Sequence, residues 1–97
     1  MFKLTVEDVF VIKNRGVVAT GRVESGTLRV GDTVHINGGH GVTVDAIEVF
    51  RKSIDEATVG VNIGVLFKGI DKSQIGRGAV LTSSGEAPPI ENTTVIV

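Results

Sequence analysis

The chain has 97 residues, with 10 basic and 11 acidic side chains and a formal net charge of −1. This length corresponds to a single domain, residues 1–97, that buries about 64% of its extended surface in one modest core. Near-neutrality excludes an overall basic field, so we expect no binding to duplex DNA. The absence of cysteine excludes thiolate chemistry, and two histidines argue against a histidine-rich metal site, so we expect neither a metal nor a cofactor.

The apolar runs and the start of the chain bear on its localisation. The longest apolar runs are far shorter than a bilayer span. Glu7 and Asp8 stand where a secretory signal needs an uninterrupted apolar stretch. We therefore expect a cytoplasmic protein with no membrane partner.

The apolar residues are mostly β-branched, with 17 Val and 9 Ile against 4 Leu and 5 Ala. Because β-branched side chains lose rotamer freedom in helices and pack well on pleated sheets, this composition predicts strands. Glycines interrupt the chain at intervals typical of an all-β meander or barrel. The sequence therefore predicts an all-β fold of short strands and tight turns.

In the first half of the chain, alternating apolar residues predict strands over residues 4–12, 17–24, 27–30 and 33–36. In the first strand, the alternating apolar residues change from even to odd positions after Val6. Ser25-Gly26 is typical of a two-residue hairpin between the second and third strands. In the fourth strand we expect Val34 and Ile36 to face inward. Residues 37–41, which contain three glycines, are predicted to form a loosely packed tip.

A further strand is predicted over residues 42–50, followed by a polar excursion over residues 51–56. Its apolar positions change parity, which predicts a bulge near Asp45-Ala46. Such a bulge would change the direction in which the side chains of Glu48 and Phe50 point.

The rest of the chain is predicted to hold strands over residues 62–67, 79–82 and 93–97. Residues 71–75 are predicted to form a helical turn, which Asp71 can cap. Residues 83–97 contain both prolines and are interpreted as a linker-like tail that ends in the short last strand.

No catalytic arrangement is recognisable in the sequence. The chain lacks the G-x-x-x-x-G-K-[ST] phosphate loop of a nucleotide hydrolase and the G-x-S-x-G elbow of a serine hydrolase. Glu7 and Asp8 could be paired carboxylates, but adjacent strand residues point to opposite faces and do not share one substrate. We therefore expect no enzymatic activity, and no binding or hydrolysis of GTP.

Several strings, in one order and spacing, closely resemble the second domain of bacterial elongation factor Tu over roughly residues 2–82. They are Glu7-Asp8-Val9-Phe10, Arg15-Gly16-x-Val18-Ala19-Thr20-Gly21-Arg22-Val23-Glu24-x-Gly26, Val30-Gly31-Asp32, Phe50-Arg51-Lys52, Asp55-Glu56-Ala57 and Asn62-x-Gly64-x-Leu66-x-x-Gly69-Ile70. The resemblance implies a small closed six-stranded antiparallel β-barrel. Closure would also remove the exposed edges of a sheet rich in Val and Ile.

In the family that the chain resembles, this barrel helps to hold the aminoacylated 3′ end of transfer RNA. The resemblance implies that the aminoacyl group lies beside Glu7, Asp8, Phe10 and Asn62. It likewise implies that the terminal adenine is surrounded by Ile12, Val18, Glu48, Arg51 and Leu66. An unpaired base is recognised by stacking and by hydrogen bonds to its edges, which requires a few local groups and no basic surface.

The same residues also allow a purely structural interpretation. Phe10, Ile12, Val18 and Leu66 are ordinary barrel residues that also fit the core. Glu48 and Arg51 could pair with each other on the surface, an interaction of little energetic consequence.

Several positions depart from the pattern of the family. Asn14 and Val61 stand where the family has Gly and Asp, and Ser25 stands where it commonly has a basic residue. The glycine tip around His40 is shorter than the corresponding loop. The chain begins directly before the barrel, so we expect a stand-alone or excised barrel without the GTPase domain or the third domain.

Three functions remain open at this stage. The barrel could bind the aminoacyl-transfer RNA 3′ end. It could instead be a protein-interaction module that docks on a translational GTPase domain or on the ribosome without binding RNA. It could also be a duplicated barrel with a ligand outside translation, which would be favoured if its own side chains fill the pocket.

Overall fold

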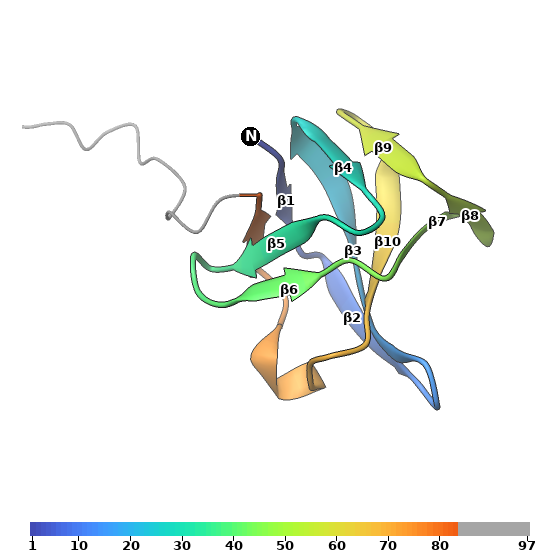
Figure 1. The fold of residues 1–97 in the computed structure, drawn as a ribbon, viewed down its shortest axis with the longest axis vertical. Coiled ribbons are helices and arrows are strands. Elements are labelled where there is room, and N and C mark those ends of the chain that lie inside the picture. The colour runs from blue at the N-terminus through green and yellow to red at the C-terminus, as the bar shows by residue number, and fades with distance from the viewer. Residues whose placement is uncertain (84–97) are drawn as a thin grey trace, which may run out of the picture.

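The computed structural model describes residues 1–83, which form short strands and one 3₁₀ turn (Figure 1). The elements are β1 (Lys3–Thr5), β2 (Asp8–Ile12), β3 (Gly16–Ser25), β4 (Thr27–Arg29), β5 (Thr33–Ile36), β6 (Gly41–Thr43), β7 (Ala46–Val49), β8 (Lys52–Ile54), β9 (Glu56–Thr58), β10 (Asn62–Phe67), η1 (Lys72–Gln74) and β11 (Val80–Thr82). This part of the chain contains no α-helix, which confirms the predicted all-β class. In the same residues, no helix has the length and apolar character required to cross a bilayer. The strand predicted over residues 93–97 and the tail from residue 84 onward lie outside the described residues.

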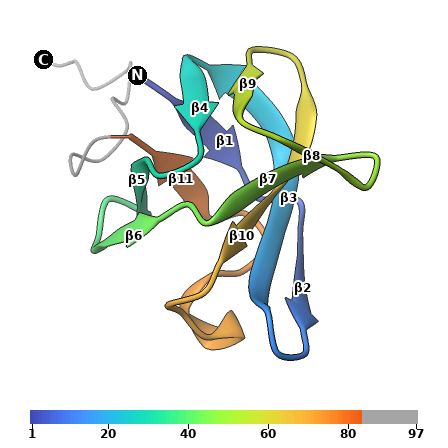
Figure 2. The same cartoon turned by 45° about the vertical axis from the view of Figure 1, so that its right-hand side comes forward.

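Nine strands form one antiparallel sheet in the order β6-β5-β11-β1-β3-β10-β7-β8, with β2 also paired to β3, while β4 and β9 form a separate ribbon. The large sheet is curled (Figure 2). Strand β6 lies at one edge and β7 lies next to the opposite edge, yet only Val44 and Asp45 separate the two strands in the sequence. The expected closed six-stranded barrel is not confirmed: among the described residues no ladder joins β6 to β8, so the sheet is open. The bend at Val44 and Asp45 connects the two edges of the sheet. Its backbone is held by two hydrogen bonds, from Val44 N–H to the Asp32 carbonyl and from Asp45 N–H to the Leu66 carbonyl.

The core lies inside this curl and follows the alternation of β3. Val17, Ala19 and Val23 of β3 are buried. Among the bulkiest fully buried or nearly fully buried side chains around them are Phe2, Leu4, Leu28, Ile47, Phe67 and Leu81. Val34 is fully buried and Ile36 packs against the core, as predicted.

Gly21 allows the first predicted strand to break in two. β1 pairs with the C-terminal end of β3, whereas β2 pairs with its N-terminal end. A Cβ atom at Gly21 would lie 2.5 Å from the Thr5 carbonyl oxygen and 2.7 Å from a methyl carbon of Leu4. The slip predicted after Val6 is therefore the break between β1 and β2.

The predicted hairpin at Ser25-Gly26 is wrong. β4 pairs with β9 and not with β3. Both edges of the C-terminal end of β3 are already occupied, since β1 pairs on one side and the backbones of Gly60 and Val61 bond to Val23 on the other. β4 must therefore find its partner elsewhere.

Two predictions for the middle of the chain also need correction. The parity change near Asp45-Ala46 is not a bulge within one strand, because β6 pairs with β5 while β7 pairs with β10. The predicted polar excursion over residues 51–56 contains β8, which forms a hairpin with β7. The hairpin turn consists of Phe50 and Arg51, both with positive φ, of 48° and 68°.

The later elements agree with the sequence. β10 coincides with the strand predicted over residues 62–67, and β11 lies within the strand predicted over residues 79–82. The predicted helical turn is η1, and the Asp71 that precedes it donates its backbone N–H to Gln74 Oε1 at 2.8 Å.

Glu24 connects β3 to β1 beside the break. Its Oε2 atom accepts a hydrogen bond from the Thr5 backbone N–H at 2.9 Å, and Lys3 Nζ lies 3.7 Å from Oε1. Hydrogen bonding from the Thr5 side chain lowers the pKa of Glu24, with the Thr5 backbone and the Lys3 charge acting in the same direction and partial burial opposing them. This stabilisation is present above the unfolded-state pKa and is lost as the pH falls through the folded-state pKa. It is small, because the carboxylate is largely solvated.

The substitution Glu24→Gln should therefore reduce the loss of stability in acid. We expect the variant to be slightly less stable than the unsubstituted protein above the ordinary Glu pKa of 4.5 and to approach it in stability below that pH. Urea midpoints measured on both sides of that pH test this. A difference between the two proteins that does not change with pH would contradict it.

The substitution Gly21→Ala should destabilise the fold by about 1–3 kcal/mol, because the added methyl group overlaps the backbone of the β1–β2 break. The matched control is Gly69→Ala, where a Cβ atom meets nothing within 4 Å and φ is not positive. We expect the control to be neutral or slightly stabilising. Equal urea unfolding curves for the two variants would contradict the role given to Gly21.

Candidate functional site

Four neighbouring strands bring most of the predicted site residues onto one face of the sheet. In an antiparallel sheet, directly opposed residues project to the same face. One row across the strands consists of Phe10, Val18, Leu66 and Ala46. The next row consists of Asp8, Thr20, Gly64 and Glu48, and a third pairs Arg22 with Asn62. These residues alternate with core residues, so the face points away from the core.

The four predicted apolar residues differ in their burial. Within residues 1–83 the core cluster and the side chains packed against it do not include Phe10, Ile12 or Val18, whereas Leu66 is among the buried apolar residues. Phe10 is 51% exposed, whereas Leu66 is 4% exposed and lies in the same row of the outer face. Phe10 and Val18 therefore lie on the outer face of the sheet, while Leu66 is buried in the same row and Ile12 lies opposite Gly16.

A hollow of about 290 Å³ adjoins this row, around Gly64. It is lined by Glu7, Thr20, Gly21, Glu48, Val49, Phe50, Asn62, Ile63 and Gly64. Glu7, Glu48 and Asn62 come from three separate segments of the chain and meet here. The hollow depends on the missing side chain of Gly64, where a Cβ atom would lie 3.1 Å from Val18 Cγ1. The hollow is open, so it is not filled by the side chains around it.

Glu48 pairs with Arg15 and not with Arg51. The distance between Arg15 Nη2 and Glu48 Oε2 is 3.6 Å, and the bridge links the β2–β3 turn to β7. Arg51 lies in the β7–β8 turn and is exposed. Within residues 1–83 neither Arg51 nor its neighbour Lys52 forms an ion pair. Two free cations therefore stand beside a hollow that contains two carboxylates.

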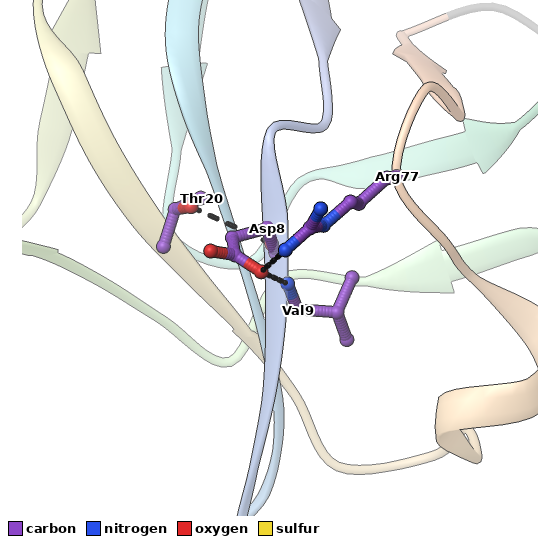
Figure 3. A network of polar contacts seen from close by, with 4 residues as sticks. All are labelled: Asp8, Val9, Thr20 and Arg77. Carbon is purple, nitrogen blue, oxygen red and sulfur yellow. Dashed lines mark hydrogen bonds and ion pairs between the residues drawn. The ribbon is translucent and has the colours of Figure 1, made fainter.

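Asp8 lies in a different environment from Glu7. Its Oδ1 atom is 3.4 Å from Arg77 Nη2 and accepts the Val9 backbone N–H at 3.2 Å, while the Thr20 hydroxyl donates to its carbonyl oxygen (Figure 3). Three strand spacings separate it from Glu48, or about 14 Å. Asp8 lines a separate hollow with Arg77, which confirms that Glu7 and Asp8 do not face one site.

Thr20, Phe50 and Gly64 were not predicted as site residues, although they line the hollow. All three belong to the strings that carry the family resemblance, so they could have been included from the sequence. The position of Phe50 depends on the two-residue turn that ends β7, which the polar composition of residues 51–56 concealed.

Two departures from the family pattern have structural explanations. Asn14 adopts a φ of 65° in the β2–β3 turn, a conformation that Asn tolerates better than most residues. Val61 packs its side chain partly against the core and accepts the Val23 backbone N–H at 3.0 Å. The acid that the family has at this position is therefore replaced by a residue that contributes to packing.

A second hollow of about 490 Å³ lies at the β2–β3 turn and is predominantly basic. Its lining includes Lys13, Arg15, Lys68 and Lys72, with Asp71 as the only acid. Among the described residues no ion pair involves the three lysines. Positive charge is therefore concentrated at this end of the molecule despite the net charge of −1.

The Gly64 hollow is rich in hydrogen-bond acceptors. Its two carboxylates and the Asn62 amide can accept hydrogen bonds from a cationic or hydroxyl-bearing group, and Phe10 and Val18 offer an apolar surface on the same face of the sheet. Within residues 1–83 no cluster of three or more His, Cys, Asp or Glu side chains could hold a metal ion.

The comparison with known protein families agrees with this architecture. The family model described as elongation factor Tu domain 2 matches residues 16–82, from the start of β3 to the end of β11. This range includes Val18, Glu48, Arg51, Asn62 and Leu66, while Glu7, Asp8, Phe10 and Ile12 precede it. Domains of this family are β-barrel modules of translation factors. Because the match covers more than half of the chain, the protein belongs to the elongation factor Tu domain 2 family.

Proposed function

We propose that this domain binds the aminoacylated 3′ end of transfer RNA in the Gly64 hollow and on the adjoining apolar row. The observation that carries the proposal is the convergence of Glu7, Glu48 and Asn62 on one hollow from three distant segments. The family resemblance assigns these residues to the aminoacyl group or the terminal adenine.

The charge distribution supports this ligand. An aminoacyl ester carries a cationic amine at one end, which suits the carboxylates of Glu7 and Glu48. The phosphates of the preceding nucleotides are anionic and suit Arg51 and Lys52 of the β7–β8 hairpin, which form no ion pair with another described residue. Phe10, which is 51% exposed, and Val18 opposite it offer an apolar surface for the flat face of a base.

The size of the hollow also limits the ligand. A volume of about 290 Å³ lies at the lower end of the range for small-molecule pockets, about 300–1,000 Å³. It therefore suits one terminal group and not a run of nucleotides. Recognition of a single chain end needs no extended basic surface, which agrees with the net charge of −1.

The proposal is tested by titrating isotopically labelled protein with an aminoacylated 3′-terminal fragment of transfer RNA and following the backbone amides by NMR. We expect shifts at Glu48, Asn62 and Leu66. The substitution Gly64→Val should fill the hollow and weaken binding by at least about tenfold, because the ligand would lose its contacts with the floor.

The matched control is Gly69→Val, which adds the same side chain at an exposed glycine outside the hollow. It should bind the fragment as the unsubstituted protein does. Thermal unfolding of both variants establishes that they are folded. No shifts at the three amides with millimolar protein would refute the proposal.

A second candidate function is docking on a translational GTPase domain or on the ribosome, without contact with the RNA end. The basic hollow at the β2–β3 turn favours it, because its three lysines, unpaired within residues 1–83, attract an anionic partner surface. This hollow lies apart from Gly64, so the two functions are separable by substitution.

Replacing Lys13, Lys68 and Lys72 together by Glu should weaken cosedimentation with small ribosomal subunits, or capture by a translational GTPase domain, by at least about tenfold at low salt. The unsubstituted protein should also lose affinity as salt is raised. The Gly64→Val variant serves as the control, since it leaves the basic hollow unchanged. Equal binding by the triple variant would exclude this candidate.

A further inference from the structure

Strand β6 has an unpaired edge that carries no charge. Among the described strands, β2, β4, β6, β8 and β9 each pair with a single other strand. Charged side chains ordinarily protect such edges from further pairing, and β2, β4, β8 and β9 each contain one. β6, with the sequence Gly-Val-Thr, contains none and forms one edge of the large sheet (Figure 1). Among these edges, that of β6 is therefore the best suited to pair with a further strand.

The register shows which backbone groups of β6 face this edge. Val44 N–H donates to the Asp32 carbonyl, on the side of β5. Successive residues of an antiparallel pair alternate between bonding to the partner strand and pointing away from it. Thr43, next to Val44, and Gly41 therefore direct their backbone N–H and C=O groups away from β5. No turn or loop of residues 1–83 forms a backbone hydrogen bond with either residue, so these groups are available to a further strand.

Two hollows beside β6 provide room for the side chains of such a strand. One has a volume of about 480 Å³ and includes Val42 and Ile70 in its lining. The other has a volume of about 290 Å³ and includes Ile36 and Val42. Neither shares a lining residue with the Gly64 hollow. An apolar strand beside β6 could therefore bury part of its side chains without obstructing the candidate RNA site.

The C-terminal part of the sequence contains a segment of suitable chemistry, outside the described residues. Residues 93–97 read Thr-Thr-Val-Ile-Val, all β-branched and uncharged, and are predicted to form a strand. Residues 84–92 contain both prolines, which suit a connection and not the interior of a sheet. The sequence therefore supplies a strand with no partner among the described strands.

The connection is long enough to reach the edge of β6. Only β5 and β6 separate β11 from that edge, so an added strand would lie three strand spacings from β11, or about 14 Å. The nine residues 84–92 can span up to about 30 Å when extended.

Charge also favours this placement. All ten basic residues of the chain lie within residues 1–83, whereas the charged residues of the C-terminal segment are Glu86 and Glu91. Lys68 lines the larger hollow beside β6 and forms no ion pair within the described chain. Its backbone N–H is bonded to the Asp45 carboxylate, which places Lys68 near the Thr43 end of β6. An acidic segment that arrives at this end therefore meets an unpaired cation.

We propose that residues 93–97 add to the sheet as a strand antiparallel to β6, with their apolar side chains in the two hollows. β11 and β6 run in the same direction, because each is antiparallel to β5. An antiparallel addition therefore needs a single reversal of the chain after β11, and it places Glu91 near Lys68. The occupant of the β6 edge is thus a segment of the same chain, a feature independent of the proposed function.

Hydrogen exchange of the backbone amides in the full chain, followed by NMR, tests this inference. The amides of Gly41 and Thr43 should exchange at least about tenfold more slowly than those of an unstructured chain. Val95→Pro should abolish this protection, because proline has no N–H to donate and is excluded from paired strands. Val42, whose N–H faces β5, should remain protected and serves as the internal reference. The matched control is Ala87→Pro, the same substitution in the connection, which should leave the protection of both amides unchanged.

Three outcomes would overturn the inference. The amides of Gly41 and Thr43 could exchange in the unsubstituted protein as fast as in an unstructured chain. Their protection could persist in Val95→Pro, which would assign it to the β5–β6 hairpin itself. Protection that increases with protein concentration would assign the edge to a second copy of the chain. Protection that is independent of concentration and lost only in Val95→Pro supports the inference.

Discussion

The alternation of β3 is the constraint on which the rest of the structure depends. This ten-residue strand pairs with β1, β2 and β10, so it fixes the register of the central sheet. Its odd-numbered residues Val17, Ala19 and Val23 fill the core, while Val18 and Thr20 belong to the outer face that carries the candidate site. A shift of one residue would exchange the two faces, so core packing and the site depend on the same register.

Local sequence patterns predicted where strands lie better than they predicted which strands pair. β10 and β11 follow from β-branched runs bounded by glycines, and Asp71 marks the start of η1. The pairing of β4 with β9 was missed, because Ser25-Gly26 carries a hairpin signal while the edges beside the end of β3 are occupied by segments distant in sequence. The same limit explains the open sheet, since no local pattern reports whether β6 and β8 meet.

The candidate site was predictable to the extent that strand register determines it. Val18, Leu66, Glu48 and Asn62 lie on one face because their strands are adjacent and antiparallel, which the family resemblance implies. The partners of the charged residues were not predictable: Glu48 pairs with Arg15, and Asp8 with Arg77, through side chains that cross between segments far apart in the chain. The positive φ of Phe50 was not predictable, because its residue type does not suggest that backbone conformation.

Although the net charge is only −1, acidic and basic side chains gather around different hollows. Glu7 and Glu48 line the Gly64 hollow, while lysines that form no ion pair within the described part of the chain line a second hollow at the β2–β3 turn. At physiological ionic strength, exposed charges are screened beyond about 8 Å, so a ligand mainly senses the charges of the hollow that it occupies. A nearly neutral domain can therefore hold carboxylates around one hollow and lysines around another, with the Arg15–Glu48 ion pair between the two.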